Sequence, residues 1–157
     1  MLDAVLMAQL VQHDLVAFCK QEIATNPVLG PLMRAAGAIF VDRGNHDAAR
    51  EPLRLGLEAL RGGRSIAVAP EGTRGNGEDI APFKHGAFLL AHRASVPVVP
   101  VVLHNSGDAM PKGSLLLNPS RVRVTVLPPL EVSAWKARDF APQVNRLEER
   151  YRAVLAG

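Results

Sequence analysis

The sequence predicts an α/β fold with a mixed, largely parallel central sheet flanked by helices. Short apolar segments rich in strand-forming residues alternate along the chain with helical patterns, and this alternation is typical of parallel sheets. The 157 residues are 48% hydrophobic and 21% charged, which is enough for one buried core and excludes disorder as the dominant state. We therefore expect a single domain over residues 1–157.

The first half of the chain is predicted to alternate between helices and strands. Helical spacing of apolar residues marks the helices, and short apolar runs mark the strands. The helices are expected over 2–12, 27–36 and 47–60, and the strands over 15–19, 38–41 and 65–69. Asn26 and Asp47 can cap the second and third helices, and Gly37 and Gly62-Gly63 can end them.

The second half of the chain continues the pattern. The helices are expected over 84–94 and 139–156, and the strands over 98–103 and 121–127. Pro97 and Pro100 disturb the hydrogen bonding of the first of these strands. Arg and Val alternate in the second, which predicts a half-buried strand with its valines inward. The last helix should carry one apolar face, formed by Phe140, Val144, Leu147, Tyr151 and Leu155.

Basic residues outnumber acidic ones, and most of them are arginine. The chain has 18 Lys and Arg, 14 of them Arg, against 15 Asp and Glu, and its pI is about 9.5. Arginine binds phosphate bidentately, so the composition favours phosphate esters, anionic lipid surfaces or nucleic acid as partners. A nucleic-acid-binding domain is the weakest of these hypotheses, because one Trp and one Tyr offer few stacking platforms. We expect no nucleic-acid partner.

Polar side chains directly follow two of the predicted strands. Asp42-Arg43 follows one of them, and the segment PEGTR at 70–74 follows another. Ligands of parallel sheets bind beyond the carboxyl ends of the strands, so Arg43 and Arg74 could clamp one phosphate. The alternative is that these arginines form surface ion pairs with Asp42 and Glu71. The pattern alone leaves both interpretations open.

Four short segments occur in a distinctive order and spacing. They are GAIFVDR at 37–43, PEGTR at 70–74, FKHGA at 83–87 and VPVVPV at 96–101. In this arrangement they resemble the glycerolipid acyltransferases, the family of 1-acylglycerol-3-phosphate acyltransferases. The resemblance covers residues 1–130, most of the chain.

The resemblance implies acyl transfer from acyl-CoA, or from an acyl carrier protein, to the free hydroxyl of a 1-acylglycerol-3-phosphate to give phosphatidate. These donors are co-substrates, and no cofactor is expected. The five scattered histidines and one cysteine predict no metal site. The lipid acceptor and the basic composition lead us to expect a cytoplasmic protein that associates peripherally with a membrane surface.

The resemblance also implies roles for individual residues. The acceptor phosphate is expected to contact Arg43, Gly72, Thr73, Arg74 and Lys84. The acyl or CoA groups are expected to contact Pro97 and Val98, and the expected catalytic residues are Asp3 and Glu71. His85, which lies within a family segment, is a further candidate phosphate contact.

The first block of the family is Asn-His, four residues and Asp, whose His is the expected general base. Asp3 stands where that Asp should be, so the partner His would precede Met1. His46 and Glu51 imitate the pair but follow Arg43 instead of preceding it. We expect little activity from a chain without this His. Either the start lies further upstream or was lost, or the chain is a non-catalytic remnant that binds phospholipid or acyl-CoA.

Overall fold

A computed structural model describes Met7, Val11 and the ranges 14–42, 50–72, 80–109 and 118–157 of the chain. The chain divides into two compact units, here called the N-terminal unit (Asp3–Val68) and the C-terminal unit (Ala69–Gly157). The single domain expected over 1–157 stays a prediction, and the two units are described in turn.

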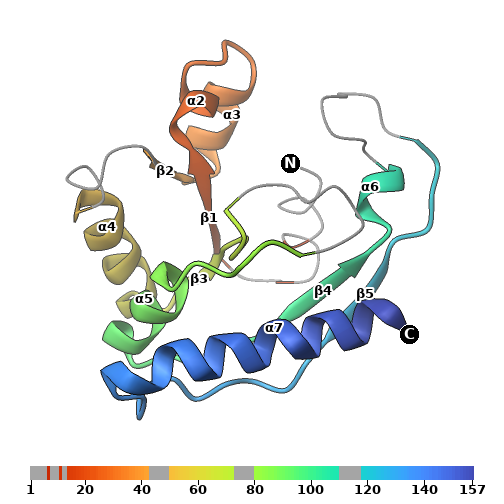
Figure 1. Cartoon of the computed structure of the whole chain (residues 1–157). Helices are drawn as coiled ribbons and strands as arrows, with labels where there is room; N and C mark the ends of the chain where they lie inside the picture. Colours follow the sequence, from red (N-terminus) through yellow and green to blue (C-terminus); the bar gives the residue numbers. More distant parts are fainter. Residues whose placement is uncertain (1–6, 8–10, 12–13, 43–49, 73–79, 110–117) are drawn as a thin grey trace. The chain divides into compact units, whose positions relative to one another are not determined.

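A parallel sheet forms the centre of the N-terminal unit. It consists of β1 (Leu15–Lys20), β2 (Ile39–Val41) and β3 (Ser65–Ala67), in the order β2-β1-β3 (Figure 1). Val16 and Cys19 of the middle strand are buried, as is Ile39 beside them. The three strands predicted in this part of the chain are confirmed, and their parallel pairing confirms the expected α/β class.

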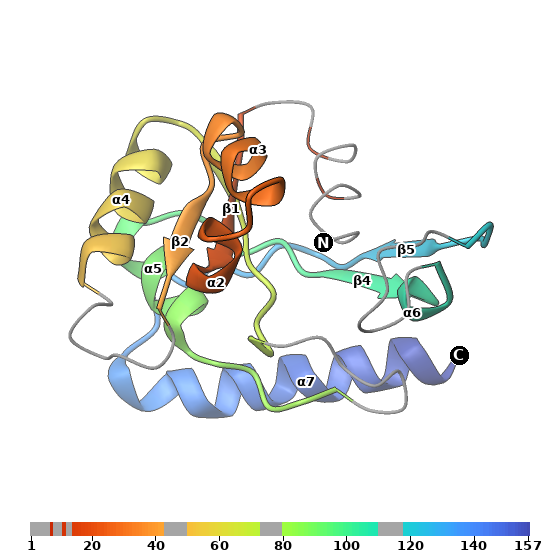
Figure 2. The same cartoon turned by 90° about the horizontal axis from the view of Figure 1, so that it is seen from above.

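Three helices accompany this sheet: α2 (Gln21–Ala24), α3 (Leu29–Ala35) and α4 (Arg50–Arg61). The last of them contacts both outer strands, β2 and β3, and Figure 2 shows it beside the sheet. The sequence pattern predicts no helix at the position of the short α2. The predicted cap Asp47 lies outside the described residues. The predicted helix over 2–12 does too, apart from Met7 and Val11, which share a backbone hydrogen bond at helical spacing.

Glycine ends both longer helices of this unit, as predicted. Gly37 has φ +70° and Gly63 has φ +81°, the left-handed conformation that favours glycine. At the first end, the N–H groups of Gly37 and Ala38 donate to the carbonyls of Arg34 and Met33. The end of α4 has the same pair of hydrogen bonds, from the N–H groups of Gly63 and Arg64 to the carbonyls of Leu60 and Ala59. Both are Schellman endings, which satisfy carbonyls that the helix leaves open.

The C-terminal unit contains α5 (Gly86–Ala94), β4 (Val101–His104), α6 (Ser106–Ala109), β5 (Arg123–Val126), the 3₁₀ helix η2 (Ala137–Asp139) and α7 (Phe140–Ala156). The strands β4 and β5 are antiparallel, and α7 contacts β4 (Figure 2). Phe83, Phe88, Val144 and Leu147 form the buried core. Four of the five predicted face residues of α7 lie in or against this core, whereas Leu155 is 41% exposed.

The strand expected over 98–103 is interrupted. Val98 forms an isolated antiparallel bridge with Leu130, and β4 begins only at Val101. Pro100 lies between them and has no N–H to donate, while its carbonyl accepts from Leu127. The proline effect that the sequence indicates is therefore confirmed.

The prediction that the valines of β5 all face inward is wrong at Val126, which is 59% exposed. The register pairs Val102 with Thr125 and His104 with Arg123. Val102 and His104 are both buried. The better covered face of this two-stranded sheet therefore carries Arg123 and Thr125, since paired residues share a face.

None of the helices in the described ranges combines the length and the apolar character needed to cross a membrane.

Candidate functional site

The described part of the PEGTR segment forms a tight corner with Lys84, within the C-terminal unit. The N–H of Gly72 donates to the carbonyl of Ala69 at 3.1 Å, and the N–H of Lys84 donates to the carbonyl of Pro70 at 2.9 Å. The half-buried Glu71 accepts the N–H of Ala81 through Oε2 at 2.9 Å. These bonds hold 69–72 against 81–84. We call this arrangement the acceptor corner.

Gly72 is required in this corner for two reasons. Its φ is +72°, which other residues rarely adopt. A Cβ on it would also lie 3.0 Å from Cε and 3.1 Å from Nζ of Lys84. The exposed lysine side chain therefore passes directly over the Gly72 backbone. The structure thus brings together three predicted site residues, Glu71, Gly72 and Lys84.

Sequence reasoning missed Glu148, a buried carboxylate of α7 that contacts the segment before Lys84. Its Oε1 accepts the N–H of Phe83 at 2.6 Å, and its Oε2 lies 3.7 Å from Arg152. A signal for it exists in the sequence: Glu148 follows Val144 by four residues and so falls on the apolar face of the helix. A charged residue at such a position is unusual unless it has a partner.

Tyr151 packs on the same segment. Its ring meets Phe83 edge to face, with centroids 5.0 Å apart, and its hydroxyl donates to the carbonyl of Val101 at 3.2 Å. Burial raises the pKa of Tyr151 to about 12. The phenol therefore remains neutral and keeps its role as a donor at physiological pH.

Several predicted site residues lie outside the described ranges: Asp3, Arg43, Thr73 and Arg74. The proposed contacts of these residues therefore stay predictions. Pro97 is exposed and Val98 is half-buried against the core, where it bridges Leu130. Their expected contact with acyl or CoA groups also stays a prediction.

Of the two histidines near the motifs, His46 lies outside the described residues, and His85 has no carboxylate partner among the described contacts. His85 is exposed and precedes α5. Glu51, which imitates the family's Asp, instead forms an exposed ion pair with Arg54 at 2.6 Å. Within the described ranges, no group of three or more His, Cys, Asp or Glu is placed to hold a metal ion.

His104 belongs to a separate polar cluster in the same unit. Arg123 Nη2 lies 3.2 Å from its Nδ1, and Thr125 Oγ1 lies 3.0 Å from its Nε2. Guanidinium groups only donate, so Nδ1 accepts and the proton of the neutral ring sits on Nε2. Burial, together with the charge of Arg123, lowers the pKa of His104.

This lowered pKa predicts a loss of stability in mild acid. The unfolded histidine takes up a proton near about pH 6.5, whereas the folded one does so only at lower pH. Below about pH 6.5 the unfolded state therefore binds more protons than the folded state does. The free energy of unfolding thus decreases as the pH is lowered. We expect the melting temperature to drop more between about pH 7.5 and 5.5 for the native chain than for His104→Gln. Equal drops would contradict the prediction, and the exposed His85→Gln should behave like the native chain.

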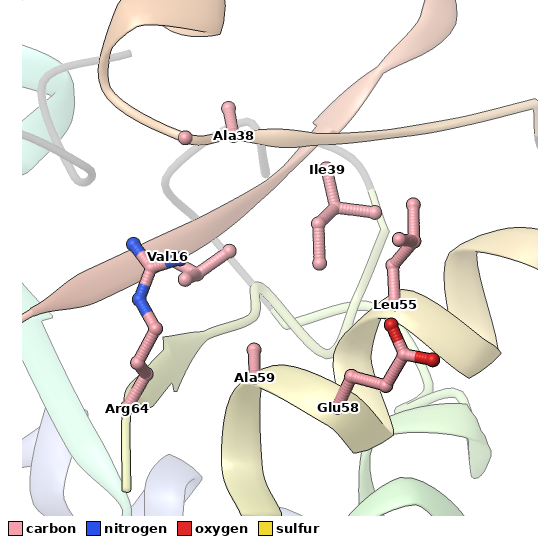
Figure 3. A pocket seen from close by; sticks show the side chains of 8 residues that line it. Val16, Ala38, Ile39, Leu55, Glu58, Ala59 and Arg64 are labelled. Carbon is pink, nitrogen blue, oxygen red and sulfur yellow. The ribbon is translucent and has the colours of Figure 1, made fainter. Parts of the chain in front are cut away.

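The N-terminal unit contains a pocket of about 450 Å³ (Figure 3). Val16, Ile39 and Leu55 contribute apolar walls, and Glu58 and Arg64 also line it. The strand residues among them lie near the amino-terminal ends of their strands. Parallel sheets bind ligands at the opposite ends, where the predicted motifs follow. Within this unit the pocket therefore lies at the other end of the sheet from the one at which such ligands bind.

Comparison with known proteins agrees with the motifs. The family model described as Acyltransferase matches residues 1–104. The 1-acyl-sn-glycerol-3-phosphate acyltransferase of Salmonella typhimurium is 33% identical over 157 residues, which covers 98% of this chain and 63% of that protein. The alpha form from Ovis aries is 32% identical over 155 residues, covering 98% of this chain and 54% of its own length.

A solved structure is similar as well. The 1-acyl-sn-glycerophosphate (LPA) acyltransferase PlsC from Thermotoga maritima matches with a TM-score of 0.69 and 25% identity, covering 86% of this chain and 54% of its own. The chain thus spans between about half and two thirds of these proteins. With its family segments in order and the family model matching 1–104, the chain belongs to the acyltransferase family.

Proposed function

We propose that the chain carries the acceptor site of a 1-acylglycerol-3-phosphate acyltransferase. The observation that carries the proposal is the acceptor corner, in which Lys84 of one family segment passes over Gly72 of another. The missing side chain of Gly72 lets the exposed Lys84 side chain lie close to the loop backbone, and its ammonium group can pair there with a phosphate. The names of the relatives support the same acceptor.

The reaction is a direct transfer between a thioester and an alcohol. The acceptor hydroxyl oxygen attacks the thioester carbonyl carbon, the C–S bond breaks, and the hydroxyl proton ends on the released thiol. A positioned base and stabilisation of the developing negative charge are sufficient for this step. In the proposal Asp3 orients that base, while Glu71 shapes the acceptor corner through its bond to Ala81.

Arg74 and Lys84 hold the acceptor phosphate in this proposal, and Gly72 and Thr73 are assigned to the same phosphate by the motif. Arg43 is assigned to the phosphate by the motif alone. Pro97 and Val98 are assigned to the acyl or CoA groups in the same way. The donor is acyl-CoA or an acyl carrier protein, and the protein works at the cytoplasmic surface of a membrane. The lipid acceptor and the excess of basic residues support this location.

A non-catalytic binding protein is the second candidate. The position five residues before Asp3, where the family's His is expected, lies outside the 157 residues. Both candidates bind the acceptor, and only the first releases CoA. We expect the 157-residue polypeptide to bind without turnover, and CoA release from acyl-CoA plus lysophosphatidate would contradict our assignment of the base to that position.

Binding of a short acceptor tests the shared part of the proposal. The probe is 1-hexanoylglycerol 3-phosphate, titrated calorimetrically into the 157-residue polypeptide. Losing a charged hydrogen bond costs about 1.5–3 kcal/mol, so Arg74→Ala should weaken binding at least about tenfold.

Arg93→Ala is the matched control, because Arg93 is an exposed arginine of α5 outside the family segments. It should change the affinity less than about twofold. Equal effects of the two substitutions would show that the arginines attract the probe only through the overall charge of the protein.

A further inference from the structure

The geometry points to Glu148 as a positioning residue for the acceptor corner. It lies on α7, outside residues 1–104 that match the family model. Its buried carboxylate fixes the backbone that presents Lys84 to the phosphate of the acceptor. This inference rests on the proposed function, which supplies the ligand.

Glu148 makes a contact that a purely structural apolar residue could not make. The residue is only 9% exposed, and its Oε1 accepts the Phe83 N–H at 2.6 Å. A buried carboxylate is costly unless it is paired and hydrogen-bonded. Arg152 of the next helical turn lies 3.7 Å from its other oxygen and is itself 44% exposed along its side chain. The strongest local contact of this carboxylate is therefore the backbone amide.

The amide that Glu148 binds belongs to Phe83, the residue directly before Lys84. Phe83 donates to Glu148, and the next residue, Lys84, donates to the carbonyl of Pro70. The Phe83 ring is buried in the core against Tyr151. Two successive peptide groups are thus fixed by different elements, one by the helix and one by the PEGTR segment. The position of the Lys84 backbone, from which its side chain extends, is therefore fixed.

Because the Lys84 backbone is fixed, the acceptor corner also fixes the position of the Lys84 ammonium group. From its backbone the Lys84 side chain passes over Gly72, so that its ammonium group lies 3.1 Å from where a Cβ of Gly72 would be. A shift of the backbone at Phe83 moves the ammonium group relative to the Gly72 peptide. A displacement of about 1 Å is enough to weaken a positioned contact strongly. Glu148 therefore acts on the acceptor through Lys84, without touching it.

Three variants of the 157-residue polypeptide test the inference. Glu148→Ala removes the acceptor of the Phe83 amide, Glu148→Gln keeps a carbonyl oxygen in its place, and Glu149→Ala removes an exposed carboxylate one residue away. The probe is again 1-hexanoylglycerol 3-phosphate, measured below the melting temperature of each variant. Glu148→Ala should weaken binding at least about fivefold, Glu148→Gln should restore most of the affinity, and Glu149→Ala should match the native chain.

Amide hydrogen exchange provides a second readout that needs no ligand. In Glu148→Ala the exchange of the Phe83 and Lys84 amides should accelerate about tenfold or more, while amides in the middle of α5 keep their rates. Unchanged exchange at both residues would overturn the inference. So would unchanged affinity in Glu148→Ala when Lys84→Ala binds the probe more weakly.

The two proposals fail in different ways. If the native chain does not bind the probe, or if Lys84→Ala binds it as well as the native chain does, the proposed function fails. The exchange arm then still decides whether Glu148 fixes the backbone at Lys84. If binding of Glu148→Gln is as weak as that of Glu148→Ala, the negative charge and not the hydrogen bond is responsible, and the positioning role is overturned.

Discussion

Phe88→Ala is expected to lower the free energy of unfolding by about 3–5 kcal/mol. The Phe88 side chain is 2% exposed and belongs to the core of the C-terminal unit, where it stacks on Trp135 with centroids 6.1 Å apart. Truncation removes its apolar contacts and leaves a cavity that α5 and α7 cannot fill without moving. Urea denaturation followed by circular dichroism measures the loss.

Leu89→Ala is the matched control on the same helix. Leu89 is 37% exposed, so its truncation creates no enclosed cavity and should cost less than about 1.5 kcal/mol. Similar losses in the two variants would mean that Phe88 is not part of a tightly packed core.

Gly30→Ala should be destabilising, although alanine normally stabilises a helix by about 1 kcal/mol relative to glycine. Gly30 is the buried residue of α3. A Cβ on it would lie 2.5 Å from the carbonyl oxygen of Ala24, which also accepts a hydrogen bond from Arg34 at 2.8 Å. The backbone at Ala24 or Gly30 must therefore move, which strains the hydrogen bond from Arg34. We expect the free energy of unfolding to fall by about 1–3 kcal/mol. Urea denaturation of the variant measures it.

Gly86→Ala is the same chemical change, but we expect it to have the opposite effect on stability. Gly86 is the first residue of α5, and nothing lies within 4 Å of a Cβ added to it. The substitution should be neutral or stabilising by up to about 1 kcal/mol, because it mainly restricts the unfolded chain. Stabilisation by Gly30→Ala as well would show that the close approach of α2 and α3 is not maintained in solution.

The features that the sequence predicts well are those that local chemistry decides. Gly37 and Gly63 end helices because their conformation is left-handed, and this requirement is visible in the sequence itself. Asn26 illustrates the usual error in a boundary. Its side chain accepts the N–H groups of Val28 and Leu29, as a cap does, yet the regular helix begins only at Leu29.

The features that it predicts poorly depend on partners far along the chain. Alternation in β5 indicates which residues share a face, but only the pairing with β4 decides which face is covered, and this exposes Val126. Glu148 is a similar case, because its partner Phe83 is 65 residues away. The motif segments could be placed in order from the sequence, whereas the contact that supports Lys84 could not.

The placement of two rare side chains makes each unit separately observable. The only cysteine, Cys19, is buried in the middle strand of the N-terminal unit, and the only tryptophan, Trp135, packs between Phe88 and Phe140 in the C-terminal unit. The rate of thiol labelling therefore reports opening of the first unit, and indole fluorescence reports loosening of the second. A single unmodified chain thus carries the two signals needed to measure whether its halves unfold together or in sequence.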